Sequence, residues 1–230
     1  MTAPVLVVDG LGVKRGGRRV LDGLSLTAGP GEIVGIVGGN GCGKTTLLAA
    51  VAGVLAPDRG GVTIDGASVW GPERERIAAR RALGYVPEGA DPPGHLTGDE
   101  LLALVAAVKG APPLDSEVRT RLDLGALAAA RIDRMSLGQR RRACLGAALV
   151  GAPRLLVLDE PDNGLDAGGI DALVELLAAR AAAGAAALVA SHDAHFLDRI
   201  KARRLSVARG QAVVQVVDLT RDQTQARDLS

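Results

Sequence analysis

The chain has 230 residues, with 27 Lys and Arg against 26 Asp and Glu and a formal net charge of +1. This length allows a full hydrophobic core, and the balanced charge provides no basic footprint for nucleic acid, so we expect no DNA or RNA partner. Two cysteines, Cys42 and Cys144, are too few for a disulfide framework and favour a reducing compartment, with the cytosol as the default. We find no secretory signal segment and no apolar run of roughly 18 residues, so we expect no membrane-spanning segment.

The order of the apolar segments predicts an α/β fold. Short runs rich in Val and Ile alternate with longer helical patterns along most of the chain. These patterns predict strands over 5–10, 32–38, 60–66, 154–161 and 186–191. They predict helices over 44–55, 98–110 and 169–183, a helix that begins near Asp193, and a final hairpin over 203–217.

We predict a single domain over residues 1–230, in which a helical part interrupts an α/β core. The core, which includes a β part, comprises residues 1–86 and 154–217. The helical part is residues 87–153, and it begins with a loop rich in Pro and Gly. The polar tail, residues 218–230, is expected to be frayed.

The segment GGNGCGKTT, residues 38–46, fits the pattern G-x-x-x-x-G-K-[ST] and lies between a predicted strand and a predicted helix. The glycines of such a loop let backbone N–H groups turn towards phosphate oxygens, Lys44 neutralises the outer phosphates, and the Thr45 hydroxyl can bind Mg²⁺. A glycine-rich turn with a stray lysine is the alternative. The position between strand and helix favours a nucleoside triphosphate site.

Two carboxylates end the predicted strand in LLVLDEP, residues 155–161. Asp159 could hold Mg²⁺, and Glu160 could orient and deprotonate a water molecule. An acidic pair at the end of a strand is usually a solvated cap. Its place downstream of a phosphate-binding loop favours the catalytic interpretation.

The segment MSLGQRRR, residues 135–142, predicts the start of a helix, because Ser136 and Gln139 form an S-x-x-Q capping box. Gly151 and Pro153 would end this helix. The free N–H groups and partial positive charge of its N-terminus suit a phosphate. No aromatic residue lies among the arginines at 140–142 to stack on bases, so we interpret them as a solvated or interface-facing side of the helix.

These three motifs, in this order, resemble those of the ATP-binding cassette (ABC) ATPases. The resemblance spans about residues 4–217 and includes NGLD at 163–166, similar to the D-loop, and ASHD at 190–193, which places His192 at the switch histidine. It implies a P-loop nucleotide-binding core with an antiparallel β part and a helical subdomain. It also implies that two cassettes, identical or different, meet head to tail around two ATP molecules.

The resemblance also assigns roles to single residues. The implied catalytic residues are Glu160, which polarises water, His192, which senses the γ-phosphate, Lys44 and Glu88. The implied Mg²⁺ ligands are Thr45, Asp159 and Glu88. The implied contacts to ATP, some of them to the ATP held by the opposite cassette, are Gly38, Gly39, Asn40, Gly41, Cys42, Gly43, Lys44, Thr45, Thr46, Arg15, Val20, Ser136, Gly138, Gln139 and Asp166.

Two motif positions depart from the family pattern. Leu137 replaces the first of the two glycines that the signature motif usually has, although Ser136 and Gly138, which would contact phosphate, remain. Glu88 stands where glutamine is usual. Its carboxylate can still bind a cation, but it adds negative charge beside the acidic pair, so metal affinity and ATP turnover can differ from the family's.

The adenine site departs as well. The aromatic residue that usually stacks on the base falls near Arg15, and no aromatic residue precedes Trp70. The guanidinium plane of Arg15 could stack on the ring while Val20 packs against it, so we expect weak selectivity for the base.

The resemblance favours the ATPase subunit of a membrane transporter, held at the cytoplasmic face of the membrane by a separate integral-membrane permease. The groove between the Glu88 loop and the helix over 98–109 would receive the permease. Glu88 and the SLGQ variant resemble the branch with ABC-2-type permeases, which favours export. Two alternatives are a regulatory cassette that transmits motion without moving cargo, and a soluble ABC protein acting on ribosomes or nucleic acid. A single cassette with a short helical insertion disfavours the second.

Overall fold

The computed structural model describes residues 3–210 and 213–218 and arranges them around two β-sheets, which confirms the predicted α/β fold. One sheet has the strand order β10-β9-β3-β8-β7-β6, and the other has the order β2-β1-β4-β5. The strands are β1 (Leu6–Arg15), β2 (Arg18–Ala28), β3 (Ile33–Val37), β4 (Arg59–Ile64), β5 (Ala67–Ser68), β6 (Leu83–Val86), β7 (Leu155–Asp159), β8 (Ala186–Ala190), β9 (Arg203–Gly210) and β10 (Val213–Asp218). The α-helices are α1 (Lys44–Val51), α2 (Glu73–Arg81), α3 (Gly98–Lys109), α4 (Ser116–Arg121), α5 (Leu137–Leu149), α6 (Ala167–Ala182) and α7 (Ala194–Arg199).

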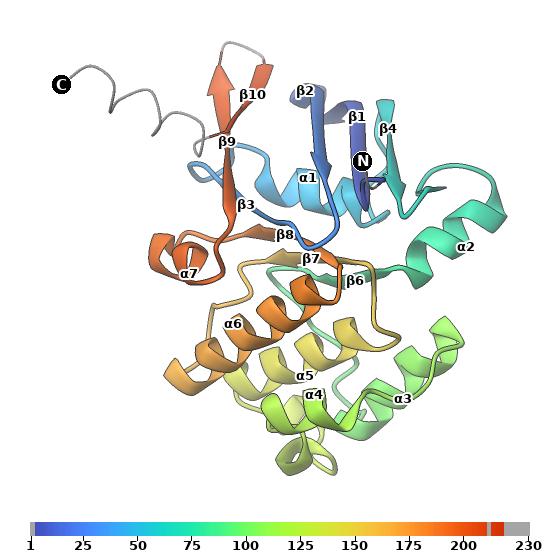
Figure 1. Cartoon of the computed structure of the whole chain (residues 1–230), viewed down its shortest axis with the longest axis vertical. Helices are drawn as coiled ribbons and strands as arrows, with labels where there is room; N and C mark the ends of the chain where they lie inside the picture. The colour runs from blue at the N-terminus through green and yellow to red at the C-terminus, as the bar shows by residue number, and fades with distance from the viewer. Residues whose placement is uncertain (1–2, 211–212, 219–230) are drawn as a thin grey trace.

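The larger sheet forms the centre of the molecule. Strands β9, β3, β8, β7 and β6 run parallel, and β10 is antiparallel to β9. All residues of β7 and β8 are buried, which explains why these segments are continuous apolar runs. Helix α1 covers one face, and α5 and α6 cover the other (Figure 1). Because parallel strands end at the same edge of a sheet, the loops that follow β3, β7 and β8 come together there.

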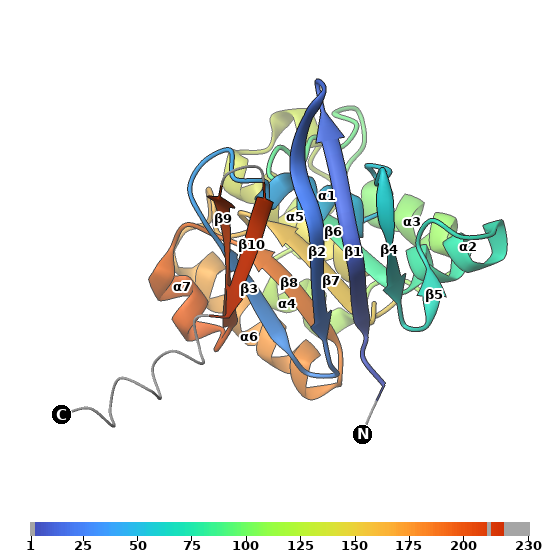
Figure 2. The ribbon, with the colours of Figure 1, turned by 90° about the horizontal axis from the view of Figure 1, so that it is seen from above.

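The smaller, antiparallel sheet lies on the other side of α1 (Figure 2). Strand β1 is longer than the predicted strand over 5–10, and it pairs with β2, a strand that was not predicted from the sequence. Gly16 and Gly17 join the two strands with φ of 54° and 75°, the left-handed conformations of a tight two-residue hairpin turn. The buried side chains of this sheet share one core with α1 and the central sheet.

The helical part packs its own apolar core against the opposite face of the central sheet. Helix α3 begins at a capping box, in which the Thr97 hydroxyl accepts from the Glu100 N–H and the Glu100 carboxylate accepts from the Thr97 N–H. It ends at Gly110, which adopts a left-handed φ of 60°. The predicted helix over 98–110 is therefore confirmed.

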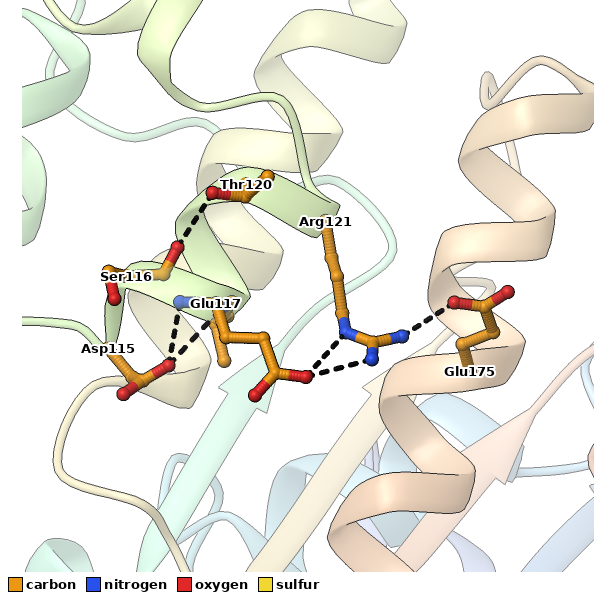
Figure 3. Close-up of polar contacts among 7 residues, drawn as sticks. Asp115, Ser116, Glu117, Thr120, Arg121 and Glu175 are labelled. Carbon is orange, nitrogen blue, oxygen red and sulfur yellow. Dashed lines mark hydrogen bonds and ion pairs between the residues drawn. The ribbon is translucent and has the colours of Figure 1, made fainter.

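An ion-pair network joins α4 of the helical part to α6 (Figure 3). The Arg121 guanidinium donates to Glu117 Oε1 at 2.8 Å within α4 and to Glu175 Oε2 of α6 at 2.6 Å. Asp115 caps the N-terminus of α4, and the Thr120 hydroxyl donates to the Ser116 carbonyl at 2.9 Å. A polar link thus holds the two helices together at their exposed sides.

Several element boundaries differ from the prediction. Helix α1 ends at Val51 rather than at residue 55, since Gly53 takes a left-handed φ of 73°. Helix α6 begins two residues earlier than predicted, because Asp166 Oδ1 accepts from the Gly169 N–H and caps it. The predicted final hairpin is present as β9 and β10, while residues 219–230 of the predicted tail lie outside the described residues. Within the described ranges, every helix is too short or too polar to cross a membrane.

Candidate functional site

A cavity of about 430 Å³ opens where β3, β7 and β8 end, and it gathers most of the residues predicted for the nucleotide. The P-loop follows β3, the acidic pair stands at the end of β7, and His192 follows β8. In the sheet, Asp159 lies opposite Ala190 of β8, so the acidic pair and the histidine are neighbours by register. The cavity is lined by Val20, Asn40, Gly41, Gly43, Lys44, Thr45, Thr46, Glu88, Asp159, Glu160 and His192.

The P-loop turns back on itself before α1. Gly41 and Gly43 have φ of 71° and 113°, and Gly43 is the N-cap of α1. A side chain at Gly43 would meet Leu21 and Val20 at 3.2 Å. Lys44 is therefore the first residue of the helix, where exposed N–H groups suit phosphate oxygens.

Lys44 is buried, with 8% of its surface exposed, and its position is fixed by polar contacts inside the chain. Its Nζ donates to the Gly38 carbonyl at 2.9 Å and lies 3.3 Å from His192 Nε2. The backbone N–H of His192 donates to Glu160 Oε2 at 3.2 Å. Lysine, histidine and glutamate thus form one connected group around the cavity.

Glu160 has two features that suit a base. Its φ is 48°, a left-handed conformation that costs energy for a residue other than glycine, and such strain is concentrated at functional sites. Its Oε1 is buried and has no hydrogen-bond partner, although His192 Nε2 lies 3.3 Å away. Burial raises the pKa of the Glu160 carboxyl, while the His192 N–H lowers it. A carboxylate oxygen left without a donor can accept a proton from a water molecule in the cavity.

Asp159 offers an oxygen for a metal ion. Its Oδ2 is buried without a hydrogen-bond partner. Burial raises the pKa of its carboxyl, and the charge of Glu88 raises it further, although a hydrogen bond from Thr45 opposes this shift. Mg²⁺ bound to a nucleotide takes few protein oxygens, because phosphates and water supply the rest. The Thr45 hydroxyl and the free oxygen of Asp159 fit that requirement.

The signature segment forms a second cavity, which shares no lining residue with the first. The predicted capping box is present: Ser136 Oγ accepts from the Gln139 N–H at 3.2 Å, and Gln139 Oε1 accepts from the Ser136 N–H at 2.9 Å. This cavity has a volume of about 470 Å³. It is lined by Asp123, Ala126, Leu127, Ser136, Leu137, Gly138, Gln139, Arg142, Gly164 and Asp166.

Besides the four residues that line the signature cavity, four residues assigned to ATP do not line the first cavity. Gly38 and Gly39 belong to the P-loop backbone, and the Cys42 side chain is buried beneath it. Arg15 is exposed at the end of β1, opposite Arg18. Of the two residues predicted for the adenine, only Val20 lines the cavity.

The interpretation of the arginines at 140–142 as a solvated or interface-facing side of the helix is wrong for Arg141. This side chain is buried, with 6% of its surface exposed, and it donates to three backbone carbonyls. Arg140 is half-buried, with 30% of its side chain exposed, and pairs with Asp91 at 3.3 Å. The signal was present in the helical period, because position 141 lies one turn before the buried Leu145 and so falls on the inner side of α5.

Comparisons of the sequence with known proteins all indicate the same family. The ABC transporter family model matches residues 21–163, more than half of the chain. The cytochrome c biogenesis ATP-binding export protein CcmA of Bordetella parapertussis is 40% identical over 191 residues, 82% of this chain and 83% of CcmA. The zinc import ATP-binding protein ZnuC of Rhizobium meliloti is 36% identical over 199 residues, 85% of this chain and 61% of ZnuC. The ABC transporter ATP-binding/permease protein Rv1747 of Mycobacterium tuberculosis is 35% identical over 191 residues, 80% of this chain but only 22% of Rv1747.

Solved structures agree with this family. An ATP binding subunit of an ABC transporter has a TM-score of 0.86 and 25% identity, and the match covers 97% of this chain and 93% of that one. The dimeric bacterial ABC transporter cassette MJ0796 has a TM-score of 0.74 at 22% identity over 87% of this chain and 93% of that one, a likeness in fold. The chain therefore belongs to the ABC transporter family, in which it is an ATP-binding subunit, an ATPase cassette.

Proposed function

We propose that this cassette hydrolyses Mg-ATP at the P-loop cavity and thereby drives export through a separate integral-membrane permease. The main support for this proposal is the connected group of Lys44, His192 and Glu160 around one cavity, in which a buried Glu160 oxygen has no hydrogen-bond donor. In this proposal the cassette is held at the cytoplasmic face of the membrane by the permease. A second cassette, identical or different, supplies the signature segment that completes each ATP site.

The chain's own residues divide the work of hydrolysis. Lys44 and the P-loop amides bind the outer phosphates, and Thr45 and Asp159 hold Mg²⁺. The metal, when bound, neutralises charge that develops on the phosphates. Glu160 accepts a proton from the attacking water through its free oxygen. His192 keeps Glu160 oriented through its backbone N–H and senses the γ-phosphate with its ring, which is half exposed towards the cavity.

A third cavity, a mainly apolar groove, supports the proposed contact with a permease. It has a volume of about 310 Å³, lies between the end of β6 and α3, and includes Pro87 and Asp91 in its lining. Glu88, between them in sequence, lines the ATP cavity instead. One short loop therefore faces both sites, and a cytoplasmic helix of the permease seated in the groove would contact the segment that carries Glu88.

The proposed direction of transport rests on sequence similarity, whereas the proposed ATPase chemistry rests on the geometry of the P-loop cavity. CcmA, an export protein by name, shares 40% identity, whereas ZnuC, an import protein by name, shares 36%. Glu88 and Leu137 resemble the exporters with ABC-2-type permeases, so we place this chain with export. Copurification of the tagged chain from membranes, with identification of the integral protein that accompanies it, tests both the partner and the direction.

Glu160→Gln tests the catalytic assignment. The amide keeps the size of the side chain but cannot take a proton from water, so we expect kcat for ATP to fall by about 10²–10⁴. The affinity for Mg-ATP should be retained, as measured by titration with the nucleotide. Glu175→Gln, the same change at an exposed carboxylate on α6, is the matched control. Turnover at the unmodified rate in Glu160→Gln would remove Glu160 from this role.

A further inference from the structure

The guanidinium of Arg141 lies where three motif-bearing segments meet. Nη2 donates to the Glu88 carbonyl at 2.9 Å, Nη1 to the Pro87 carbonyl at 3.2 Å, and Nε to the Asn163 carbonyl at 3.4 Å. The acceptors belong to two loops that are distant in sequence, one after β6 and one after β7. Arg141 itself stands on α5, five residues after its N-cap Ser136.

Burial of the Arg141 guanidinium costs free energy unless its N–H groups find acceptors. A cation removed from water needs hydrogen-bond partners for its donors. Within residues 3–210 and 213–218, no carboxylate lies within ion-pair distance of Arg141, so its direct partners are backbone carbonyls. Arginine suits this task because its donors form a rigid planar fork that can reach several acceptors at once.

Both loops held by Arg141 carry groups of the ATP cavity. The first loop carries Glu88, whose side chain lines the cavity. The second loop begins at Glu160, and the Asn163 N–H donates to the Glu160 carbonyl at 3.2 Å, which closes the turn directly behind the proposed base. Fixing the carbonyls of residues 88 and 163 therefore fixes the backbone on which two cavity carboxylates stand.

We propose that Arg141 is a positioning residue for ATP hydrolysis, which sets Glu88 and Glu160 relative to each other by fixing both loops against α5. It contacts neither nucleotide nor water in this role. Because α5 begins at the signature segment, the same guanidinium joins that segment's helix to the two loops of the P-loop cavity within one chain. This inference rests on the proposed catalytic role of Glu160.

The test is steady-state ATPase kinetics on the purified full chain with Mg-ATP. In Arg141→Gln, a neutral side chain with fewer donors replaces the fork, and we expect kcat to fall by about 10- to 100-fold, since small misplacement of reacting groups has effects of this size. The KM for ATP should change little, because Lys44 and the P-loop are untouched. Arg141→Lys keeps the charge and part of the bonding, so it should recover part of kcat.

Arg180→Gln is the matched control, because it removes the same charge from a partly buried arginine of α6 whose acceptor, the Pro153 carbonyl at 3.1 Å, lies outside both loops. We expect its kinetics to match those of the unmodified chain. Amide hydrogen exchange of the same proteins measures how firmly the two loops are held, independently of catalysis. Exchange should rise several-fold in residues 88–91 and 162–165 of Arg141→Gln, and stay unchanged in β8. Thermal melting verifies that each variant is folded, and Arg141→Lys serves the test if Arg141→Gln is not.

Two results overturn the inference. One is an unchanged kcat with unchanged exchange in both loops for a folded Arg141 variant. The other is a rise in KM with kcat retained, which would assign Arg141 to nucleotide binding. The proposed function fails separately, through unmodified turnover in Glu160→Gln, so the two failures can be distinguished.

Discussion

The P-loop cavity and the signature cavity are built in opposite ways. In the P-loop cavity Lys44, Asp159 and Glu160 are all buried, and lysine, histidine and glutamate contact one another. In the signature cavity Ser136 is exposed and Leu137 has 64% of its surface exposed. The groups of the P-loop cavity are buried and contact one another within the chain, whereas the signature cavity exposes its groups at the surface.

The difference follows from where each cavity lies in the fold. The P-loop cavity forms at the edge of a parallel sheet, where three strands must end together. The signature cavity forms at the start of α5, on the helical part. There the capping box satisfies two backbone N–H groups, those of Ser136 and Gln139, and the Leu137 and Gly138 amides at the helix N-terminus remain available to a phosphate brought by another molecule. The comparison therefore predicts that substitutions in the two cavities separate binding from turnover.

The largest effect is expected for Lys44→Ala. In the proposed function Lys44 binds the outer phosphates, and a hydrogen bond to a charged group is worth roughly 1.5–3 kcal/mol, so the affinity of Lys44→Ala for Mg-ATP should fall by about 10- to 100-fold. Hydrolysis should be lost with it. Nucleotide titration and phosphate release measure the two effects.

Lys201→Ala, at an exposed lysine after α7, is the control for Lys44→Ala and should retain both activities. If Lys44→Ala bound ATP as tightly as the unmodified chain, the P-loop cavity would not be the nucleotide site. The two cavities could then not be assigned to binding and turnover.

The sequence could predict the P-loop cavity because its signals are local. The glycines, Lys44 and Thr45 are close together in sequence, and they lie between a short run rich in Val and Ile and a longer run rich in Ala and Leu, the order of a strand and a helix. Strand β2 was not predicted, because its first residues, Arg18 and Arg19, are exposed charges beside a glycine turn and obscure the alternation that begins at Leu24. Pairing with β1 decides that strand, and pairing is a contact between segments rather than a local pattern.

A smaller and more selective effect is expected for Ser136→Ala. In the proposed function the Ser136 hydroxyl contacts the phosphate of ATP held by the partner cassette, so its loss should lower kcat at least about tenfold, the equivalent of about 1.4 kcal/mol. Binding of Mg-ATP by the isolated chain should be unchanged, since the P-loop cavity is complete without it. ATPase kinetics and nucleotide titration measure this separation.

Thr97→Ala is the matched control for Ser136→Ala, because Thr97 forms the same capping box at the start of α3. Each loss of a cap should lower the free energy of unfolding by about 1 kcal/mol. Only Ser136→Ala should lower kcat. An equal loss of turnover in both variants would mean that the effect is one of helix stability alone.

The sequence predicted the start of α5 but not the role of its arginines. A capping box is a local pattern, and the structure contains it at Ser136 as expected. The burial of Arg141 depends on two loops that are 22 and 53 residues away and supply its acceptors. Charge suggested exposure, whereas the helical period placed this position on the inner side of α5, and the period was the better guide.

The smallest effect is expected for Glu175→Gln, which breaks the link between α4 and α6 that Figure 3 shows. Both partners are partly exposed, with side-chain exposures of 34% for Arg121 and 63% for Glu175, so the ion pair should contribute little to the free energy of unfolding. Chemical denaturation of Glu175→Gln, Arg121→Gln and the double variant isolates the pair's own contribution. Added salt should reduce that contribution, because exposed charges are screened. Binding of Mg-ATP should be unaffected, since neither residue lines the P-loop cavity. A large loss of folding free energy, or weakened ATP binding, would show that the helical part and the P-loop cavity depend on each other, contrary to the comparison.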